Sequence, residues 1–230
     1  LGIELPNLDF YEPAFAREVE WTLLEALRQR GDREHGRSTY FRLSTKPIDQ
    51  KLMDEALQRL GEDEVRRQTL LGGYRVVDRR TTAPDLPARD TVQIAAGGIM
   101  IPEAIAAAHR LHEEGVAANV INVTSARRLY RTLRGARDAQ LADARRQLNL
   151  EHLATLFPRE ERHAPIVTVQ DGASHGLAFL GSIYGAPTVP LGVDNWGQSG
   201  SRAALYEYAG IDSDQIVNAA MLALELTEES

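Results

Sequence analysis

An α/β fold is predicted for most of this chain, with an open, mostly parallel β-sheet that carries helices on both of its faces. The first observation is that short apolar segments alternate with helical stretches, at residues 91–96, 119–123, 165–169 and 188–193. The second is that each apolar segment ends at glycine or at a polar residue. Strands that alternate with helices form parallel sheets, because the connecting helices cover both faces.

The first 77 residues predict a helix followed by a strand. In the helix, expected over 13–30, apolar residues recur at four-residue steps and share one face: Phe15, Val19, Leu23 and Leu27. Residues 38–44 are rich in β-forming types, and Pro47 stops this strand. Residues 51–60 are expected to form a short helix or a loop. The polar segment 78–90, which contains two prolines, is the best linker candidate.

Regular alternation starts at residue 91. The first strand ends at Gly97-Gly98, and Gly115 ends the helix that follows. The next strand leads into an arginine-rich stretch, 126–163, which is expected to be helical in more than one piece. Further helices are expected at about 175–184, 202–208 and 212–226, the last opened by a pattern that resembles a capping box.

Composition excludes several classes of protein. The chain has 230 residues, a formal net charge of -7 and no cysteine. The negative charge argues against a nucleic-acid or anionic-membrane binder, and the lack of cysteine excludes a disulfide framework and thiolate zinc sites. No apolar run is long enough to cross a membrane, and no signal-peptide pattern is seen. A cytoplasmic location is therefore expected.

Polar residues at the strand ends are the candidate binding residues. Ligands in open α/β sheets bind beyond the carboxyl ends of the strands. A strand-end crevice would bring together Thr124, Ser125, Asp171, His175, Asp194 and Asn195. The other interpretation is that these residues are ordinary turns and helix caps.

Motifs for nucleotide, metal and nucleophilic chemistry are weak or missing. No Gly-x-Gly-x-x-Gly and no Walker-type loop follows a strand, and no histidine pair has metal-ligand spacing. Asp171 and Asn195 resemble the spacing of a magnesium-diphosphate motif, but Gln170 stands where its first glycine should be. Ser174 lacks the surroundings of a nucleophile elbow. No residue is therefore assigned as catalytic, cofactor-binding or metal-ligating.

A basic helix face is expected near residue 130. Arg127, Arg128, Arg131 and Arg134 recur at helical spacing. Such a face in an acidic protein is usually solvated or pairs with another subunit, and phosphate binding is the sharper alternative.

Three segments together resemble the C-terminal domain of the transketolase superfamily, at residues 166–176, 189–200 and 205–211. The second of them matches the pattern Gly-x-Asp-x-(aromatic)-Gly-x-Ser, which follows a strand in that family. Residues 5–18 are similar to the end of the pyrimidine-binding domain of homodimeric pyruvate dehydrogenases, and the helical insertion after Ser125 is also more similar to that group. The resemblance implies a remnant of a pyrimidine-binding domain at 1–77, the linker at 78–90 and a transketolase C-terminal-like domain at 91–230.

The resemblance also implies a function. The expected parent is a thiamine-diphosphate-dependent 2-oxo acid dehydrogenase, and this chain, which begins at Leu1 instead of methionine, would be its C-terminal fragment. The fragment would assemble the dimer and border the active site without catalysing the reaction alone. Thiamine diphosphate and magnesium would bind to upstream segments, and none is expected to bind to this fragment. The alternatives are part of a transketolase, against which the helical insertion argues, and a non-catalytic small-ligand binding module.

Substrate contacts and partners follow from the same resemblance. The pyruvate enzymes carry a histidine in the loop that corresponds to 45–51, and this sequence has none there. Transketolases have an arginine just after the same strand that contacts substrate phosphate, so Lys46, with Ser44 beside it, is expected to lie near the substrate. The expected partners are a second copy, the upstream domains and an acyltransferase component, with no nucleic acid and no membrane.

Overall fold

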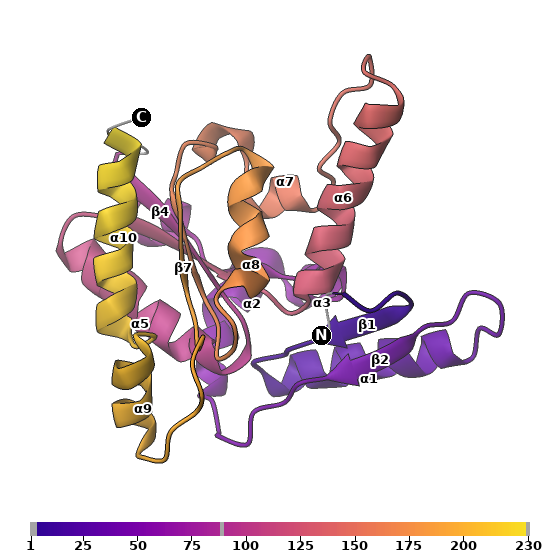
Figure 1. Cartoon of the computed structure of the whole chain (residues 1–230), viewed down its shortest axis with the longest axis horizontal. Helices are drawn as coiled ribbons and strands as arrows, with labels where there is room; N and C mark the ends of the chain where they lie inside the picture. The colour runs from indigo at the N-terminus through magenta and orange to yellow at the C-terminus, as the bar shows by residue number, and fades with distance from the viewer. Residues whose placement is uncertain (1–3, 88–89, 229–230) are drawn as a thin grey trace.

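The computed structural model describes residues 4–87 and 90–228, which form two sheets and the helices around them (Figure 1). The N-terminal part contains β1 (Leu8–Tyr11), α1 (Ala16–Arg30) and β2 (Ser38–Phe41). The predicted helix and strand are confirmed, although the strand ends at Phe41 instead of residue 44. The sequence did not predict β1, which pairs with β2 in parallel as a two-stranded sheet. Rings stack across this pair, with Phe10 and Tyr40 centroids 5.7 Å apart.

Three short helical elements lead from the small sheet to the large one. They are the 3-10 helix η1 (Gln50–Met53), α2 (Asp54–Leu60) and α3 (Glu62–Leu71). Met53, Ala56 and Val65 are buried in the same apolar cluster as the centre of the large sheet. The N-terminal segment is therefore packed onto the sheet through a continuous core.

The large sheet has five strands in the order β3-β5-β4-β6-β7. They are β3 (Tyr74–Val77), β4 (Thr91–Ala96), β5 (Ala117–Asn122), β6 (Ile166–Val169) and β7 (Thr188–Leu191). All neighbours pair in parallel except β3, which runs antiparallel to β5 at the edge. The predicted α/β class with a mostly parallel sheet is confirmed.

Helices cover both faces of this sheet, as predicted. On one face lie α5 (Ile101–Glu113), which continues from the 3-10 helix η3 (Gly98–Met100), and α10 (Ser213–Glu228). The other face carries the arginine-rich insertion and the segment after β6, in the elements α6 (Ala126–Ala142), α7 (Leu153–Leu156), η4 (Arg159–Glu161), α8 (His175–Ala178) and η5 (Phe179–Ile183). Successive side chains of a strand point to opposite faces of the sheet, so neighbouring residues of β4 enter different cores. Ile94 packs in the apolar cluster with α5 and α10, whereas Ala95 packs in the cluster with α6 to η5.

The strand β3 lies in the large sheet although it precedes the expected linker at 78–90. Tyr74 pairs with Asn122 and Arg75 with Ile121. The linker begins with the buried Asp78 and the short helix α4 (Arg79–Thr82), whose first residue Arg79 is also buried. A polar, proline-containing composition does not reveal this burial, because Asp78 is ion-paired inside the protein and the Arg79 guanidinium donates to the Leu86 carbonyl oxygen. The domain division itself stays a prediction.

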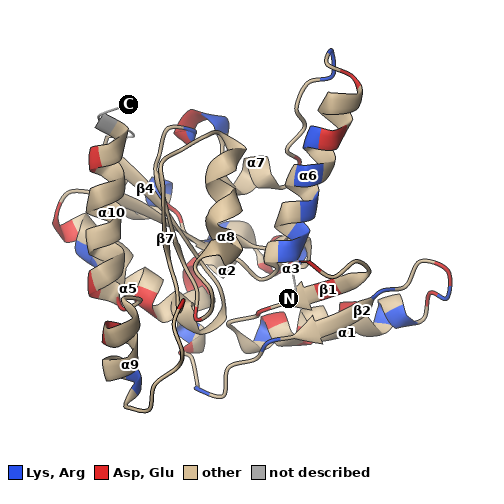
Figure 2. Cartoon of the chain, viewed as in Figure 1, with Lys and Arg blue, Asp and Glu red and all other residues tan. Residues whose placement is uncertain are grey.

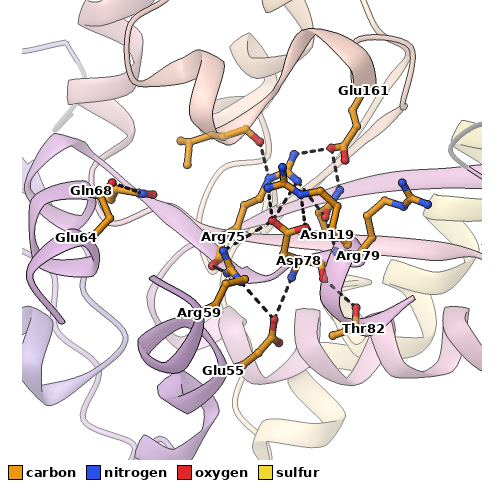
Figure 3. A network of polar contacts seen from close by, with 12 residues as sticks. Glu55, Arg59, Glu64, Gln68, Arg75, Asp78, Arg79, Thr82, Asn119 and Glu161 are labelled. Carbon is orange, nitrogen blue, oxygen red and sulfur yellow. Dashed lines mark hydrogen bonds and ion pairs between the residues drawn. The ribbon is translucent and has the colours of Figure 1, made fainter. Parts of the chain in front are cut away.

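A buried polar network fixes β3 and α4 to the insertion (Figure 3). The Arg75 guanidinium donates to Glu161 Oε2 at 2.5 Å and to the Leu156 carbonyl oxygen at 2.9 Å. Glu161 Oε2 also accepts from Gln93 and Asn119. The network lies toward the start of β4, so it stabilises the sheet at the end opposite to its ligand-binding edge.

A second buried carboxyl group joins α1 to the large sheet. Glu18 is fully buried and accepts hydrogen bonds from the Tyr74 hydroxyl at 2.7 Å, from Asn122 Nδ2 at 2.7 Å and from the backbone N–H groups of Ala14 and Phe15. Burial raises the pKa of Glu18 to about 7, although its hydrogen-bond donors oppose the change.

This pKa predicts a pH-dependent stability. Folded Glu18 holds a proton that the unfolded chain releases above its ordinary pKa of 4.5. The stabilisation is therefore complete below about pH 4.5 and is lost as pH rises to about 7, by up to roughly 3 kcal/mol. Urea unfolding at pH 5, 6, 7 and 8 measures this, with Glu18→Gln as the reference that does not titrate. A difference between wild type and Glu18→Gln that does not change with pH would contradict the assignment.

Among the described residues, no helix is both long and apolar enough to cross a membrane.

Candidate functional site

A cavity of about 350 Å³ opens at the carboxyl ends of β4 and β6, beside the loop that follows β2. We call it the strand-end cavity. Its charged lining residues come from distant parts of the sequence: Glu12, Arg42, Lys46, Asp171 and Arg202. Glu12, Arg42 and Asp171 come just after parallel strands of the two sheets, so the carboxyl ends of both sheets border the cavity.

Arg42 is the central residue of this cavity. Its Nη1 atom donates to Glu12 Oε1 at 2.5 Å. Its Nη2 atom donates to the Asp171 backbone oxygen and lies 3.3 Å from Asp171 Oδ2. Arg42 follows β2, Glu12 follows β1 and Asp171 follows β6, so one guanidinium joins the small sheet to the large one.

Glu12 is held in an unfavourable environment for a charge. Its side chain is buried, and this burial raises its pKa while Arg42 lowers it in part. The turn after β4 makes room for it: a Cβ atom on Gly98 would lie 2.9 Å from Glu12 Cγ, and Gly98 has a φ of +53°. Glycine is required at this turn, because another residue would meet both the carboxylate and backbone strain.

The cationic side of the cavity is more exposed. Lys46 lies in the loop after β2, where its backbone N–H donates to Ser44 Oγ at 3.0 Å. Arg202 begins α9 (Arg202–Ala209), and its guanidinium lies over the Tyr206 ring, 5.8 Å from the centroid. An anionic group in the cavity would face these two cations, whereas the charge of Arg42 is already matched by Glu12 and Asp171.

The structure brings together some of the predicted site residues. Ser44, Lys46 and Asp171 line the strand-end cavity. His175 lies in a neighbouring cavity of about 430 Å³, and Asp194 and Asn195 lie in another of about 400 Å³. Asp171 borders all three cavities, so it is the junction between them. Asp194 Oδ1 also accepts from the Ser174 backbone N–H at 2.9 Å, and hydrogen bonds from the Ser174 side chain and then from this N–H lower the pKa of Asp194.

Thr124 and Ser125 do not reach these cavities. Both side chains are fully buried. The Thr124 hydroxyl donates to the Thr69 carbonyl oxygen at 2.7 Å, and the Ser125 hydroxyl donates to the Phe10 carbonyl oxygen at 2.6 Å. Ser125 is also the N-cap of α6. For these two residues, the interpretation as turn and cap residues fits the structure better than the interpretation as crevice residues.

Sequence reasoning missed Glu12, Arg42 and Arg202. Arg42 interrupts an otherwise apolar and hydroxyl-rich strand, and this break in the pattern is the signal that could have indicated it. Glu12 and Arg202 carry no such signal, because Glu12 directly follows β1 and Arg202 begins α9, and charged residues are ordinary at the ends of elements. Only the fold shows that all three lie together.

The described residues do not fit a diphosphate-magnesium group. They contain no cluster of three His, Cys, Asp or Glu side chains that could hold a metal ion. Asp171 is paired with Arg42, and Asn195, which lines the 400 Å³ cavity that Asp171 also borders, lies in an exposed loop. Asp171 and Asn195 thus do not form a dication site, and the described part of the chain offers thiamine diphosphate no magnesium anchor.

Comparisons with known proteins match nearly the whole length of the chain. The family of transketolase-like TK C-terminal domains matches residues 72–212. The chromosomal and plasmid transketolases of Cupriavidus necator are each 27% identical over 222 residues, which is 96% of this chain. The chain spans 27% of the length of these curated relatives.

Solved structures share the fold. The transketolase from Leishmania mexicana aligns with a TM-score of 0.59 and 20% identity, over 98% of this chain and 26% of that protein. A Pichia stipitis transketolase R356L mutant in complex with a fructose phosphate aligns with a TM-score of 0.66 and 16% identity, over 97% and 26%. A split-gene transketolase, described as an inactive beta4 tetramer, aligns with a TM-score of 0.60 and 23% identity, over 98% of this chain and 60% of that one.

Proposed function

Since this chain belongs to the family of transketolase-like TK C-terminal domains, we propose that it is the C-terminal part of a thiamine-diphosphate-dependent transketolase. The observation that carries this proposal is the match to two transketolases over 96% of the chain. The expectation of a 2-oxo acid dehydrogenase gains no support from these comparisons, which favour the ketol-transfer alternative.

The proposed role of this chain is to form one wall of the substrate site. Lys46 and Arg202 would attract the phosphate of a sugar-phosphate substrate into the strand-end cavity, and Ser44 would hold the Lys46 loop in place. Arg42, between Glu12 and Asp171, would keep the two sheets at a fixed distance. Thiamine diphosphate would supply the carbanion chemistry from the remaining domains, together with magnesium.

We place the domain boundary of this enzyme near Gly72. The family match begins there, and β3, from Tyr74, already pairs with β5. Residues before it would be the end of a pyrimidine-binding domain, since β1 and β2 form a sheet of only two strands. On this proposal the segment 78–90 connects two strands of one domain.

The proposed partners are the remaining domains and a second copy of the enzyme. The split-gene transketolase of similar fold, described as an inactive beta4 tetramer, supports the proposal of a homo-oligomer. An acyltransferase partner belongs only to the 2-oxo acid dehydrogenase alternative, and the cytoplasmic location stays a prediction.

The 2-oxo acid dehydrogenase remains a second candidate because of one observation. Residues 5–18 resemble the pyruvate enzymes, and this segment contains Glu12, which pairs with Arg42, and Glu18, which joins α1 to the large sheet.

An assay of the complete enzyme decides between the two candidates. The chain is combined with the polypeptide that carries the remaining domains, and ketol transfer from a sugar phosphate is compared with pyruvate decarboxylation. Transfer without decarboxylation supports the proposal. Release of carbon dioxide from pyruvate, without ketol transfer, would replace it with the second candidate.

Lys46→Ala is expected to raise KM for the sugar phosphate by roughly tenfold with little change in kcat, because it removes a contact that binds substrate and transition state equally. The matched control is Lys51→Ala, since Lys51 is the other lysine of the chain and lies outside the strand-end cavity. Equal effects of the two variants on KM would show that Lys46 has no special contact with substrate.

A further inference from the structure

A second cavity, of about 420 Å³, lies between the start of the small sheet and the first turns of α6. It shares no lining residue with the strand-end cavity. Its lining contains Arg37, Arg128 and Arg131, together with the carboxylates Asp9 and Glu151. Figure 2 shows that basic residues repeat along α6 from the end that lies next to β1. This is the basic helix face that the sequence predicted and that the proposed function does not use.

One carboxylate oxygen of Asp9, in the lining of this arginine cavity, is held by Arg128. The Asp9 side chain is 1% exposed, and its Oδ2 atom accepts from Arg128 Nη2 at 2.7 Å. Arg128 also donates to the Leu70 carbonyl oxygen at 2.9 Å and lies over the Tyr11 ring, 5.3 Å from its centroid. Arg128 is thus a structural cation that positions the carboxylate.

Arg37 and Arg131 share the remaining oxygen of Asp9 without a hydrogen bond. Arg37 Nε lies 3.4 Å and Arg131 Nη1 lies 3.7 Å from Asp9 Oδ1. Asp9 Oδ1 and Arg37 Nε are both buried atoms that lack a hydrogen-bond partner among the described residues. Burial first, and then the charge of Arg37, lower the pKa of Arg131. The two guanidinium groups therefore share a single carboxylate oxygen, Asp9 Oδ1.

The face of α6 that lines the cavity leaves room for a ligand beside the guanidinium groups of Arg37 and Arg131. Arg128, Arg131, Thr132 and Gly135 lie on one face of the helix, by their spacing. Gly135 has no side chain, and a Cβ atom built there would meet nothing within 4 Å. Among the described residues no aromatic side chain lines the cavity, so this lining offers no surface on which a nucleotide base could stack.

We propose that the arginine cavity binds a small oxyanion of the phosphate-monoester class, held by Arg37 and Arg131. Guanidinium groups bind tetrahedral oxyanions through paired N–H donors, and two of them match a dianion in charge. The carboxylates of Glu151 and Asp9 in the lining oppose the ligand and weaken its binding. The inference does not depend on the proposed function, because the site contains none of the residues of the strand-end cavity.

Calorimetric titration of the 230-residue chain with inorganic phosphate tests the proposal, with chloride at equal ionic strength as the reference. Saturable binding of phosphate is expected, and Arg131→Gln or Arg37→Gln should weaken it by roughly tenfold or more, the loss of one charge-assisted hydrogen bond. The matched control is Arg134→Gln. Arg134 lies on the same helix, is exposed and pairs with Asp138 at 2.8 Å, outside the cavity. This control should change the affinity less than about twofold.

Glu151→Gln makes the test independent of folding defects. Removing the opposing carboxylate should tighten phosphate binding by roughly threefold to tenfold, and a gain of affinity cannot arise from misfolding. The proposal is overturned if phosphate has no more effect than chloride, or if Arg134→Gln weakens binding as much as Arg131→Gln. If phosphate has no more effect than chloride, the arginines would instead be assigned to pairing with an acidic side chain of another polypeptide.

Discussion

Replacing Arg75 with methionine is expected to lower the free energy of unfolding by about 3–5 kcal/mol. Its side chain is 3% exposed, and it neutralises Glu161, whose side chain is 4% exposed. Methionine fills a similar volume but leaves the Glu161 carboxylate buried with only amide donors, and it also leaves the Leu156 carbonyl oxygen without this donor (Figure 3). An unpaired buried charge costs more than the pair contributes. Urea denaturation at neutral pH measures the change.

The matched control for Arg75 is Arg80→Ala. Arg80 also pairs with an acid of the network, with Nη2 2.7 Å from Asp78 Oδ2, but its own side chain is 58% exposed. Its removal should cost about 1 kcal/mol or less. Equal losses for Arg75→Met and Arg80→Ala would show that the contribution of an arginine of this network to stability does not depend on its burial.

Replacing Arg42 with alanine is expected to lower the free energy of unfolding by about 1–3 kcal/mol. This loss is smaller than the loss expected for Arg75, because the Arg42 side chain is 39% exposed. The loss comes from Glu12, which stays buried without its counter-ion. In the variant the pKa of Glu12 should rise further, because the group that lowers it is gone. The destabilisation should therefore be larger at pH 8 than at pH 5, where Glu12 can take up a proton.

A double variant separates the charge effect from lost packing. Glu12→Gln combined with Arg42→Met removes both charges and keeps similar volumes. It should recover much of the stability that Arg42→Ala loses, and it should not depend on pH between 5 and 8 through this pair. A double variant less stable than Arg42→Ala at pH 8 would contradict the account of Glu12 as an unpaired buried charge.

The sequence alone was sufficient to predict those strands of the large sheet that alternate with helices. The segments at 91–96 and 165–169 are apolar because both faces of a parallel strand are covered, and that pattern is visible without a structure. β1 was missed because its four residues, Leu8–Tyr11, mix an acid with apolar residues. The buried Asp9 is explained by its ion pairs with Arg37, Arg128 and Arg131, which are far away in the sequence.

The candidate site was predicted only in part for the same reason. Lys46, Ser44 and Asp171 were placed near a ligand by their positions after strands, and they line one cavity. Thr124 and Ser125 have the same kind of position, but their hydroxyl groups donate to carbonyl oxygens of other segments. Whether a polar residue at a strand end faces a cavity or a backbone group depends on tertiary contacts that no local pattern records.

Calorimetric titration with thiamine diphosphate and magnesium tests the central proposal most directly. The chain alone should give no binding heat, because its described residues offer no diphosphate-magnesium site. The chain together with the polypeptide that carries the remaining domains should bind the cofactor. Micromolar binding by the chain alone would contradict the account, because this part of the enzyme would then hold the cofactor that we assign to the other domains.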